Sequence, residues 1–483
     1  MKERHAMVLL GILLFLVFSV YAIALPGPFH FDDLATVAVD PSLQHMAAWW
    51  EDVSRHVRPL LKASFVLTYA MGDLSSNVPF FHRLGNIMIH LCSIVAFSVL
   101  GFGVIRTCMP DVTIRTRRRA AFGAAALFGF HPMATEAVSY ISGRSMSLGT
   151  LLALLGLLSY MHFRTTPVPH GNAASRKWLI ITFLLLLAAV FVRETMAGVV
   201  LLFIVWEWAR RDREDRAFSA GRLKRTLKVA WVPVVITLAL LAWMLFHPRY
   251  AFLLEMSGRI AIDRLTDPSF LTAIAYFMRG FCLLQYPNIA PDVTAVTLSL
   301  QGRAAGIGAL VLIFAFCLRF RNSRPHLLFG FLWTLAWLAP LYVFQVRHDT
   351  VTERHFYPAL WGPALIIATE LALIGRADSI RRTFTMTLLT LLTIILLVVT
   401  AARNTNYRTE IALWEAAERS APNNVRVLNN LGVAYMEASR WQDAQVVLEK
   451  AVKMNPGYAK ARRNFAAALH QHRPNEGGAL MPP

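Results

Sequence analysis

Long apolar segments recur along the whole chain of 483 residues, and this pattern limits what the chain can fold into. A helix needs about 20 apolar residues to cross the hydrocarbon core of a bilayer. With 56% hydrophobic and 16% charged residues, the chain is too apolar for a soluble protein of this length. We therefore expect an all-α polytopic membrane protein with about eleven spans. The expected spans are 7–25, 84–105, 119–132, 146–163, 178–192, 195–209, 229–247, 304–318, 327–345, 357–375 and 384–402.

Basic residues between these segments predict how the chain is oriented. The clusters of Arg and Lys all follow even-numbered spans, for example 106–119 after the second span and 210–228 after the sixth. Because Lys and Arg mark the cytoplasmic side, the N terminus is predicted to be cytoplasmic. The loop 26–83 and the C-terminal part then lie on the opposite, outer face. This orientation, rather than nucleic-acid binding, accounts for the net charge of +19.

One further apolar stretch, 268–289, is interrupted by Arg279 and Pro287. We expect it to re-enter the membrane or to lie at its surface without crossing. If it crossed, every later segment would change sides. The four cysteines have neither a CxxC pattern nor metal-ligand spacing, so no disulfide framework or metal site is predicted. They are Cys92, Cys108, Cys282 and Cys317.

From Asn404 onward the chain is polar and has an internal repeat. Pro422 and Pro456 are 34 residues apart, and so are Leu431 and Phe465, which is the tetratricopeptide period. Helices are predicted at 409–420, 424–437, 440–453 and 458–470. Two repeats are few for independent stability, so we expect them to pack on the membrane domain or on a partner.

The chain is therefore expected to have two domains and a tail. The expected boundaries are 1–403 for the membrane domain, 404–472 for the repeats and 473–483 for a disordered tail. The membrane domain has two large outer loops, 26–83 and 248–303.

Acidic and basic side chains gather in turns that are predicted to lie on the outer face. Asp32 and Asp33 follow the first span, where burial at the membrane boundary can raise a carboxyl pKa. An outer cavity with carboxylates and arginines suits an anionic, lipid-linked substrate, since Arg binds phosphate bidentately and a carboxylate can accept a hydroxyl proton. The other candidates are Arg58, His131, Glu136, Arg144, Arg193, Glu194, Glu353, Arg354, His355 and Tyr357.

Plainer interpretations exist for the same residues. Asp32 and Asp33 also suit a solvated loop that ends a helix, and Arg193 with Glu194 also suits a pair that caps two helices at the membrane surface. A third polar group, His82, Asn86 and His90, shares one helical face at a spacing of four. We favour hydrogen bonding between helices over metal binding for these three side chains.

Four stretches together resemble the transmembrane and tetratricopeptide repeat containing (TMTC) proteins, which are polytopic glycosyltransferases of the GT-C superfamily. They are Phe-His-Phe-Asp-Asp at 29–33, the run from His131 to Arg144, Arg-Glu-Thr at 193–195 and Glu-Arg-His-Phe-Tyr-Pro at 353–358. The stretches at 58–60 and 82–90 are similar too. The resemblance covers nearly the whole chain. Eukaryotic members have long repeat arrays, whereas this chain has about two repeats and no Asn-x-Ser/Thr sequon, which favours a bacterial inner-membrane protein.

The resemblance implies a reaction. A sugar, typically mannose, moves from a polyprenyl phosphate to a hydroxyl acceptor, here expected to be a protein, on the periplasmic or luminal face. It also implies that Asp33 or Asp32 is the catalytic base, with Asp33 as the first choice. No cofactor or metal is expected, because the phosphate monoester is already a good leaving group.

Roles for the other residues follow from the same mechanism. Arg354 and Arg193 would stabilise the departing phosphate, with Arg144 and Arg58 as further candidates. Carboxylates at 136, 194 and 353 would orient those arginines or the sugar hydroxyls. Two other functions compete with this one. The first is a ligase or polymerase of polyprenyl-linked glycans, and the second is a non-enzymatic membrane scaffold whose repeats bind partners.

Overall fold

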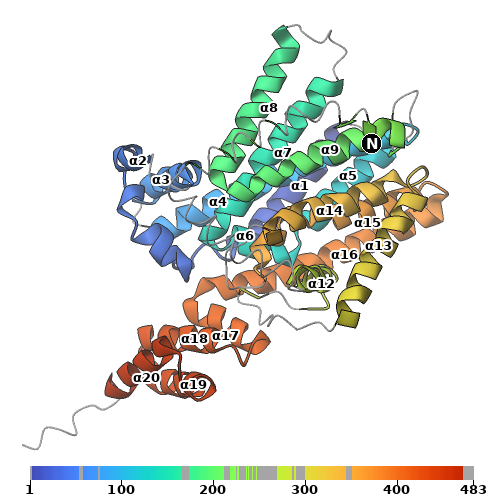
Figure 1. Ribbon diagram of the computed structural model, residues 1–483. Helices are drawn as coiled ribbons and strands as arrows, with labels where there is room; N and C mark the ends of the chain where they lie inside the picture. The colour runs from blue at the N-terminus through green and yellow to red at the C-terminus, as the bar shows by residue number, and fades with distance from the viewer. Residues whose placement is uncertain are drawn as a thin grey trace, which may run out of the picture.

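The computed structural model describes residues 3–53, 58–73, 77–165, 173–211, 218–224, 269–285, 288–289, 300–343 and 351–471, with isolated positions between 226 and 246. All regular secondary structure in these residues is helical, so the expected all-α class is confirmed. Long helices lie side by side in a bundle, and a smaller group of C-terminal helices lies below one end of it (Figure 1).

The bundle contains a helix at every expected span except 229–247, most of which lies outside the described residues. Four helical stretches of the described chain are long and apolar enough to cross a membrane, so we treat the chain as an integral membrane protein. They are Arg4–Ala22, Val78–Cys108, Ile141–Thr165 and Ser379–Arg408. The bundle helices are α1 (Glu3–Ala22), α4 (Val78–Cys108), α5 (Ile114–Gly129), α7 (Arg144–Thr165), α8 (Ala173–Val192), α9 (Val199–Ala209), α13 (Leu300–Arg319), α14 (Pro325–Val343), α15 (Trp361–Ile374) and α16 (Ser379–Thr405).

The centre of the bundle is α4, which packs against α1, α3, α5 and α7. Helix α5 approaches α4 and α15 closely because its buried face is made largely of alanine, including Ala120, Ala124 and Ala125. Aromatic rings fill the space beside it, with Phe97 stacked on Trp361 at 5.2 Å between ring centroids. Large apolar side chains on α1, α13 and α16 are exposed, as expected for surfaces that face lipid.

Shorter helices lie at the end of the bundle that carries the first outer loop. This loop forms α2 (Met46–Asp52) and α3 (Pro59–Asp73). Helix α12 (Ser269–Phe281) has 13 residues, so it is about 20 Å long and too short to cross a hydrocarbon core of about 30 Å. This length agrees with the prediction that 268–289 does not span. The remainder of the loop 248–303 lies largely outside the described residues.

The C-terminal helices are α17 (Glu410–Ser420), α18 (Val425–Glu437), α19 (Trp441–Met454) and α20 (Ala459–Gln471), as predicted. Helices α18 and α20 begin 34 residues apart, at 425 and 459, in agreement with the repeat. Their shared core includes Trp414, Leu431 and Leu448. Ile289, which follows α12, packs against this core, so the C-terminal helices contact the rest of the described chain. The predicted disordered tail lies outside the described residues.

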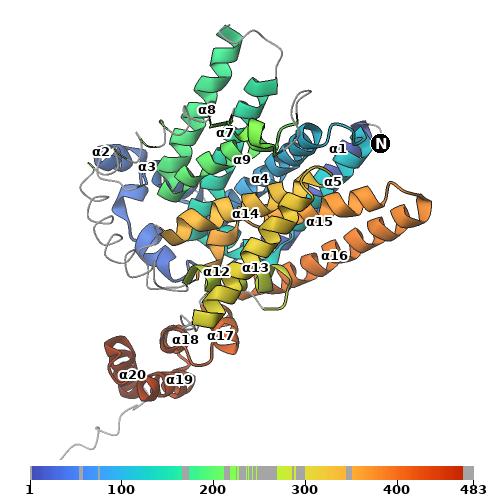
Figure 2. The ribbon, with the colours of Figure 1, turned by 45° about the vertical axis from the view of Figure 1, so that its right-hand side comes forward.

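The two ends of the bundle differ in what they carry. Both views show the N terminus and the turn between α15 and α16 at one end, and α17–α20 at the other (Figures 1 and 2). Basic loops meet at the first end, where Arg211 contacts both Thr107 and Asp111. The connections with most of the candidate site residues lie at the second end.

Candidate functional site

The connection between α5 and α7 is the centre of this site. It consists of η4 (Pro132–Ala134), α6 (Thr135–Val138) and η5 (Ile141–Gly143), and nearly all of it is buried. Gly143 is required here because a Cβ atom would collide with the carbonyl oxygen of Glu136. Side chains of the first loop and of the 353–356 turn hydrogen-bond this segment, and Arg193 contacts Ser145 just after it. Turns that are far apart in the sequence are thus brought together.

The two aspartates of the first loop have different surroundings. Asp33 is fully buried, and its Oδ1 accepts hydrogen bonds from the backbone N–H of Ser142 (2.8 Å) and from the Ser142 hydroxyl (2.5 Å). Its Oδ2 accepts from the N–H of His30 at 3.2 Å. Burial raises the pKa of Asp33, although these hydrogen bonds oppose the shift.

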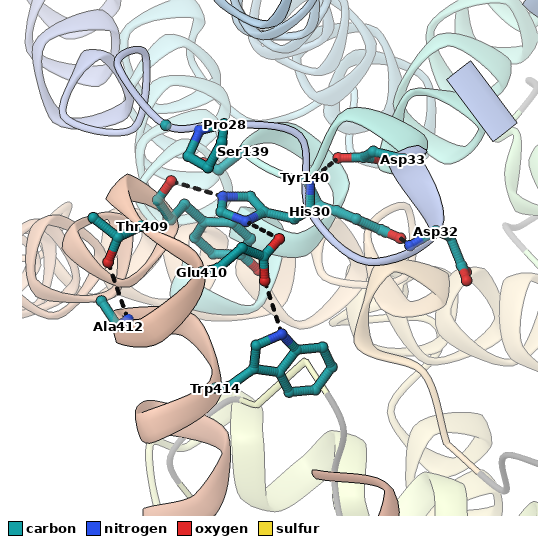
Figure 3. Close-up of polar contacts among 12 residues, drawn as sticks. Pro28, His30, Asp32, Asp33, Ser139, Tyr140, Thr409, Glu410, Ala412 and Trp414 are labelled. Carbon is teal, nitrogen blue, oxygen red and sulfur yellow. Dashed lines mark hydrogen bonds and ion pairs between the residues drawn. The ribbon is translucent and has the colours of Figure 1, made fainter. Parts of the chain in front are cut away.

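Asp32 is partly exposed, and its backbone N–H donates to the Tyr140 hydroxyl at 3.1 Å. Figure 3 shows the Asp32 and Asp33 side chains pointing away from each other. Asp33 therefore holds the loop against the 141–143 turn, whereas Asp32 reaches the surface of the site.

Glu136 and Arg354 form a buried pair beside these aspartates. One Glu136 oxygen accepts from the backbone N–H of Arg354 at 2.9 Å, and the other accepts from its guanidinium at 2.5 Å. The guanidinium also lies over the Tyr140 ring, 5.6 Å from its centroid. Desolvation disfavours the charged guanidinium, but the Glu136 carboxylate outweighs it and raises the pKa of Arg354.

Arg193 immediately precedes η6 (Glu194–Gly198) and contacts the first turn of α7, next to this segment. Its guanidinium donates to the Ser145 hydroxyl at 2.8 Å and contacts Nε2 of His355 at 2.7 Å. Since a guanidinium has no acceptor, Nε2 of His355 must accept, and the imidazole proton lies on Nδ1. His355 follows Arg354 in η7 (Glu353–Phe356), so two arginines are held within one short region.

Two further carboxylates bind arginines at this end of the bundle. Glu353 is fully buried, pairs with Arg403 at 2.6 Å and accepts from the backbone N–H of Asn288 at 2.7 Å. Glu194 binds Arg58 through two hydrogen bonds of 2.9 and 2.5 Å. Burial opposes ionisation of Glu194, but the Arg58 guanidinium outweighs it and lowers the pKa to about 2.

Three of the predicted site residues, Arg144, His131 and Tyr357, contact neighbouring helices and loops and not the acid–arginine pairs. Arg144 donates to Asn86 (2.6 Å) and to the carbonyls of Ser64 and His82, so it joins α3, α4 and α7. His131 accepts from the Met133 N–H and stacks on Phe281 at 4.9 Å. The Tyr357 hydroxyl bonds to His90 at 2.8 Å.

The interhelical role expected for 82, 86 and 90 is observed, since each side chain hydrogen-bonds another element. Among the described residues no three His, Cys, Asp or Glu side chains are grouped to hold a metal ion.

Sequence reasoning missed several residues of this region. Arg83 is buried and donates to the carbonyls of Gly27, Pro28 and Ser139, which fixes the first loop on the α5–α7 connection. Arg403 was also missed. Both arginines interrupt or end long apolar helices, and that position is the only sequence signal either one offers.

The fold and these contacts define a helical integral membrane protein with buried acid–arginine pairs at one end. No protein-family model matches the chain, and no solved structure is significantly similar to it. Curated relatives do match. Protein O-mannosyl-transferase F38B6.6 of Caenorhabditis elegans is 22% identical over 462 residues, which is 91% of this chain and 61% of the relative.

Two relatives from Drosophila melanogaster match as well. Protein O-mannosyl-transferase Tmtc3 is 22% identical over 84% of this chain and 49% of its own length. Protein O-mannosyl-transferase Tmtc1 is 34% identical over 147 residues, or 30% of this chain and 15% of the relative. This chain thus spans less than two thirds of each. Its curated homologues are TMTC-family protein O-mannosyl-transferases, which confirms the resemblance seen in the motifs.

Proposed function

We propose that this chain is a membrane glycosyltransferase that moves a sugar, with mannose as the first candidate, from a polyprenyl phosphate to a hydroxyl group of a protein. The observation that carries the proposal is that Asp32 and Arg354 contact the α5–α7 connection, at Tyr140 and Glu136, while Arg193 contacts Ser145 at the start of α7 and His355 beside Arg354. The names of the homologues support the reaction class and the protein acceptor.

The surroundings of the two aspartates favour Asp32 as the catalytic base. Both oxygens of Asp33 accept hydrogen bonds from the protein, and its side chain is fully buried. Asp32 is partly exposed, and the charge of its carboxylate acts on Arg354. We therefore assign Asp33 to positioning the loop, in place of the role as base that the sequence favoured.

In this mechanism Asp32 takes the proton of the acceptor hydroxyl. The hydroxyl oxygen forms a bond to the anomeric carbon while the bond from that carbon to the phosphate oxygen breaks, with inversion. The polyprenyl phosphate leaves with the bonding electron pair, and Arg354 and Arg193 stabilise its charge. Glu136 holds Arg354 in place, and Glu194 holds Arg58 in the same manner. Because the phosphate is a good leaving group, the proposed reaction includes no metal or cofactor.

The active face in this proposal is the one opposite the basic loops. In a bacterial inner membrane that face is periplasmic, the N terminus is cytoplasmic, and the C-terminal repeats are periplasmic. Helix α17 lies beside the loop that carries Asp32 (Figure 3). This contact supports an arrangement with Asp32 and the C-terminal helices on the same face of the membrane. The repeats are then placed to receive an acceptor protein near the base.

The test is sugar transfer by the purified full chain from a polyprenyl-phosphate mannose to a protein acceptor. We expect Asp32→Asn to lower kcat by about 10²–10⁴, the usual contribution of a general base. Asp33→Asn should lower activity less and should also reduce thermal stability. Asp73→Asn is the matched control, because Asp73 is an exposed acid of the same loop.

Other outcomes discriminate between the competing functions. Full activity in Asp32→Asn would remove it as the base. Transfer to a lipid-linked glycan but not to protein would favour the ligase or polymerase. A wild-type chain without transfer to any acceptor would favour the scaffold.

A further inference from the structure

His30 joins the first loop to the C-terminal helices. Its side chain is fully buried between them. Nδ1 lies 2.9 Å from Oε1 of Glu410, the first residue of α17, and Nε2 lies 2.9 Å from the carbonyl oxygen of Tyr407 (Figure 3). The loop is tight at this point, since a Cβ atom at Gly27 would collide with the same carbonyl.

Both ring nitrogens of His30 therefore face oxygen atoms. A backbone carbonyl can only accept, so Nε2 must carry a proton. The other oxygen of Glu410 accepts from the indole N–H of Trp414 at 2.8 Å, which favours the ionised carboxylate. An ionised Glu410 can also only accept, so Nδ1 must carry a proton too. With both nitrogens protonated, His30 is an imidazolium.

The charges around His30 are consistent with a cation at this position. Glu410 faces it from α17, and Asp33 faces it from its own loop. Arg83 of α4 lies nearby and donates to the carbonyls of Gly27 and Pro28. Two carboxylates and one guanidinium surround the imidazolium, so its charge offsets a local excess of negative charge.

We infer that the imidazolium of His30 fastens helix α17 to the catalytic loop and so positions Asp32 two residues later. Its effect on Asp32 rests on the proposed function; its effect on docking does not. Phe31, between the two residues, has φ of 48° and packs edge-on against Trp414 at 5.5 Å. Because φ at Phe31 is in the left-handed region, the backbone there is strained and must be held by such contacts.

A consequence is that docking depends on the contact between His30 and Glu410. Replacing either side chain with glutamine removes one charge-assisted hydrogen bond, which corresponds to a change of about tenfold or more in the equilibrium for release of α17.

Hydrogen exchange of the full chain in detergent micelles, without substrate, tests this inference. Protection of the 410–420 amides should be about tenfold lower in His30→Gln and in Glu410→Gln than in the wild type, because each change removes the charge-assisted hydrogen bond. The double variant should lose little more, since both changes remove the same contact. His470→Gln is the control and should match the wild type, because His470 is exposed on α20.

Wild-type protection in His30→Gln would overturn the inference, and so would additive losses in the double variant. The coupling to Asp32 has its own measurement. In the transfer assay, kcat of His30→Gln should be lower than that of the wild type while KM for the donor stays constant. A chain with no transfer activity would refute the proposed function, yet the exchange result would still decide whether His30 fastens α17.

Discussion

The two ends of the bundle both contain buried Glu–Arg contacts, but they arrange them differently. At the end with the basic loops, Glu370 pairs with Arg324 and is partly exposed, whereas the buried Glu207 lies among three arginines. It bonds to Arg164 at 2.6 Å, lies 3.4 Å from Arg222 and 3.6 Å from Arg210, and accepts from the Tyr160 hydroxyl. At the other end Glu136, Glu194 and Glu353 each bind a different arginine.

This difference shows what each end is suited to do. An excess of arginine around one carboxylate leaves a net positive charge, which suits the cytoplasmic ends of membrane helices. One carboxylate for each of these three arginines fixes the direction of its guanidinium and leaves each pair with little net charge. Arginines fixed in this way can stabilise charge that develops during a reaction without having to reorganise. The partly exposed Asp32 lies beside only this second arrangement.

The largest effect that separates the two ends is expected for Arg354→Ala. Transfer activity should fall by about 10²–10³, because a preorganised charge near the leaving phosphate is lost. The free energy of unfolding should fall by about 3–5 kcal/mol, because Glu136 remains buried without its cation. Initial rates and denaturant unfolding in micelles measure the two effects. Arg354→Lys keeps the charge but not the planar guanidinium, so its activity and stability should lie between those of the wild type and Arg354→Ala.

Arg222→Ala at the basic end is the matched comparison. Arg222 is as buried as Arg354, but Glu207 keeps its contact with Arg164 in this variant. Its transfer activity should stay near that of the wild type, with a smaller loss of stability. Equal losses of activity in the two variants would show that both ends act only through stability.

A second, smaller effect concerns the Glu353–Arg403 pair. Arg403→Met should cost about 3 kcal/mol of unfolding free energy, since Glu353 is left ionised in a buried position. The double variant with Glu353→Gln should recover part of this loss, and denaturant unfolding of all four proteins gives the coupling energy. Arg381→Met is the control, because its pair with Asp378 is exposed and should contribute at most about 1 kcal/mol. If the losses of unfolding free energy in the two single variants add up to the loss in the double variant, Glu353 and Arg403 are not coupled.

Local sequence patterns were sufficient for the helices and for part of the candidate site, but they missed Arg83 and Arg403. Helix positions follow from runs of apolar residues, and the four C-terminal helices follow from the 34-residue repeat. The acids and arginines of the outer turns were identified because polar side chains are costly near a bilayer. Each of these patterns can be recognised within a window of about 35 consecutive residues, so none of them depends on knowing how distant segments pack.

Pairing within the site could not be predicted in this way. The Asp33–Ser142 hydrogen bond joins residues 109 apart, and Arg354 bonds to an acid 218 residues away. Arg144 looks like Arg354 in the sequence, yet it binds carbonyl and amide oxygens between helices. Adjacent aspartates have the same local pattern, so only the packing of the 141–143 turn distinguishes the buried Asp33 from Asp32.

The smallest predicted effects are in the pH dependence of stability, and they sharpen the contrast between two acids of the same end. The pKa of Glu194 is lowered to about 2 from its ordinary value of 4.5, so its contribution to stability is present above about pH 4.5 and is lost as pH falls toward 2. The pKa of Asp33 is raised, so its contribution is present at low pH and is lost as pH rises through its folded-state value. Acidification should therefore lower the stability of the wild type relative to Glu194→Gln. The same acidification should raise the stability of the wild type relative to Asp33→Asn.

Both differences should be modest, because solvent screens the partly exposed Glu194–Arg58 pair and hydrogen bonds from Ser142 offset part of the cost of burying Asp33. Denaturant unfolding at stepped pH measures them, and slopes of the same sign in the two comparisons would contradict the assignment of Asp33 to a desolvated, structural position.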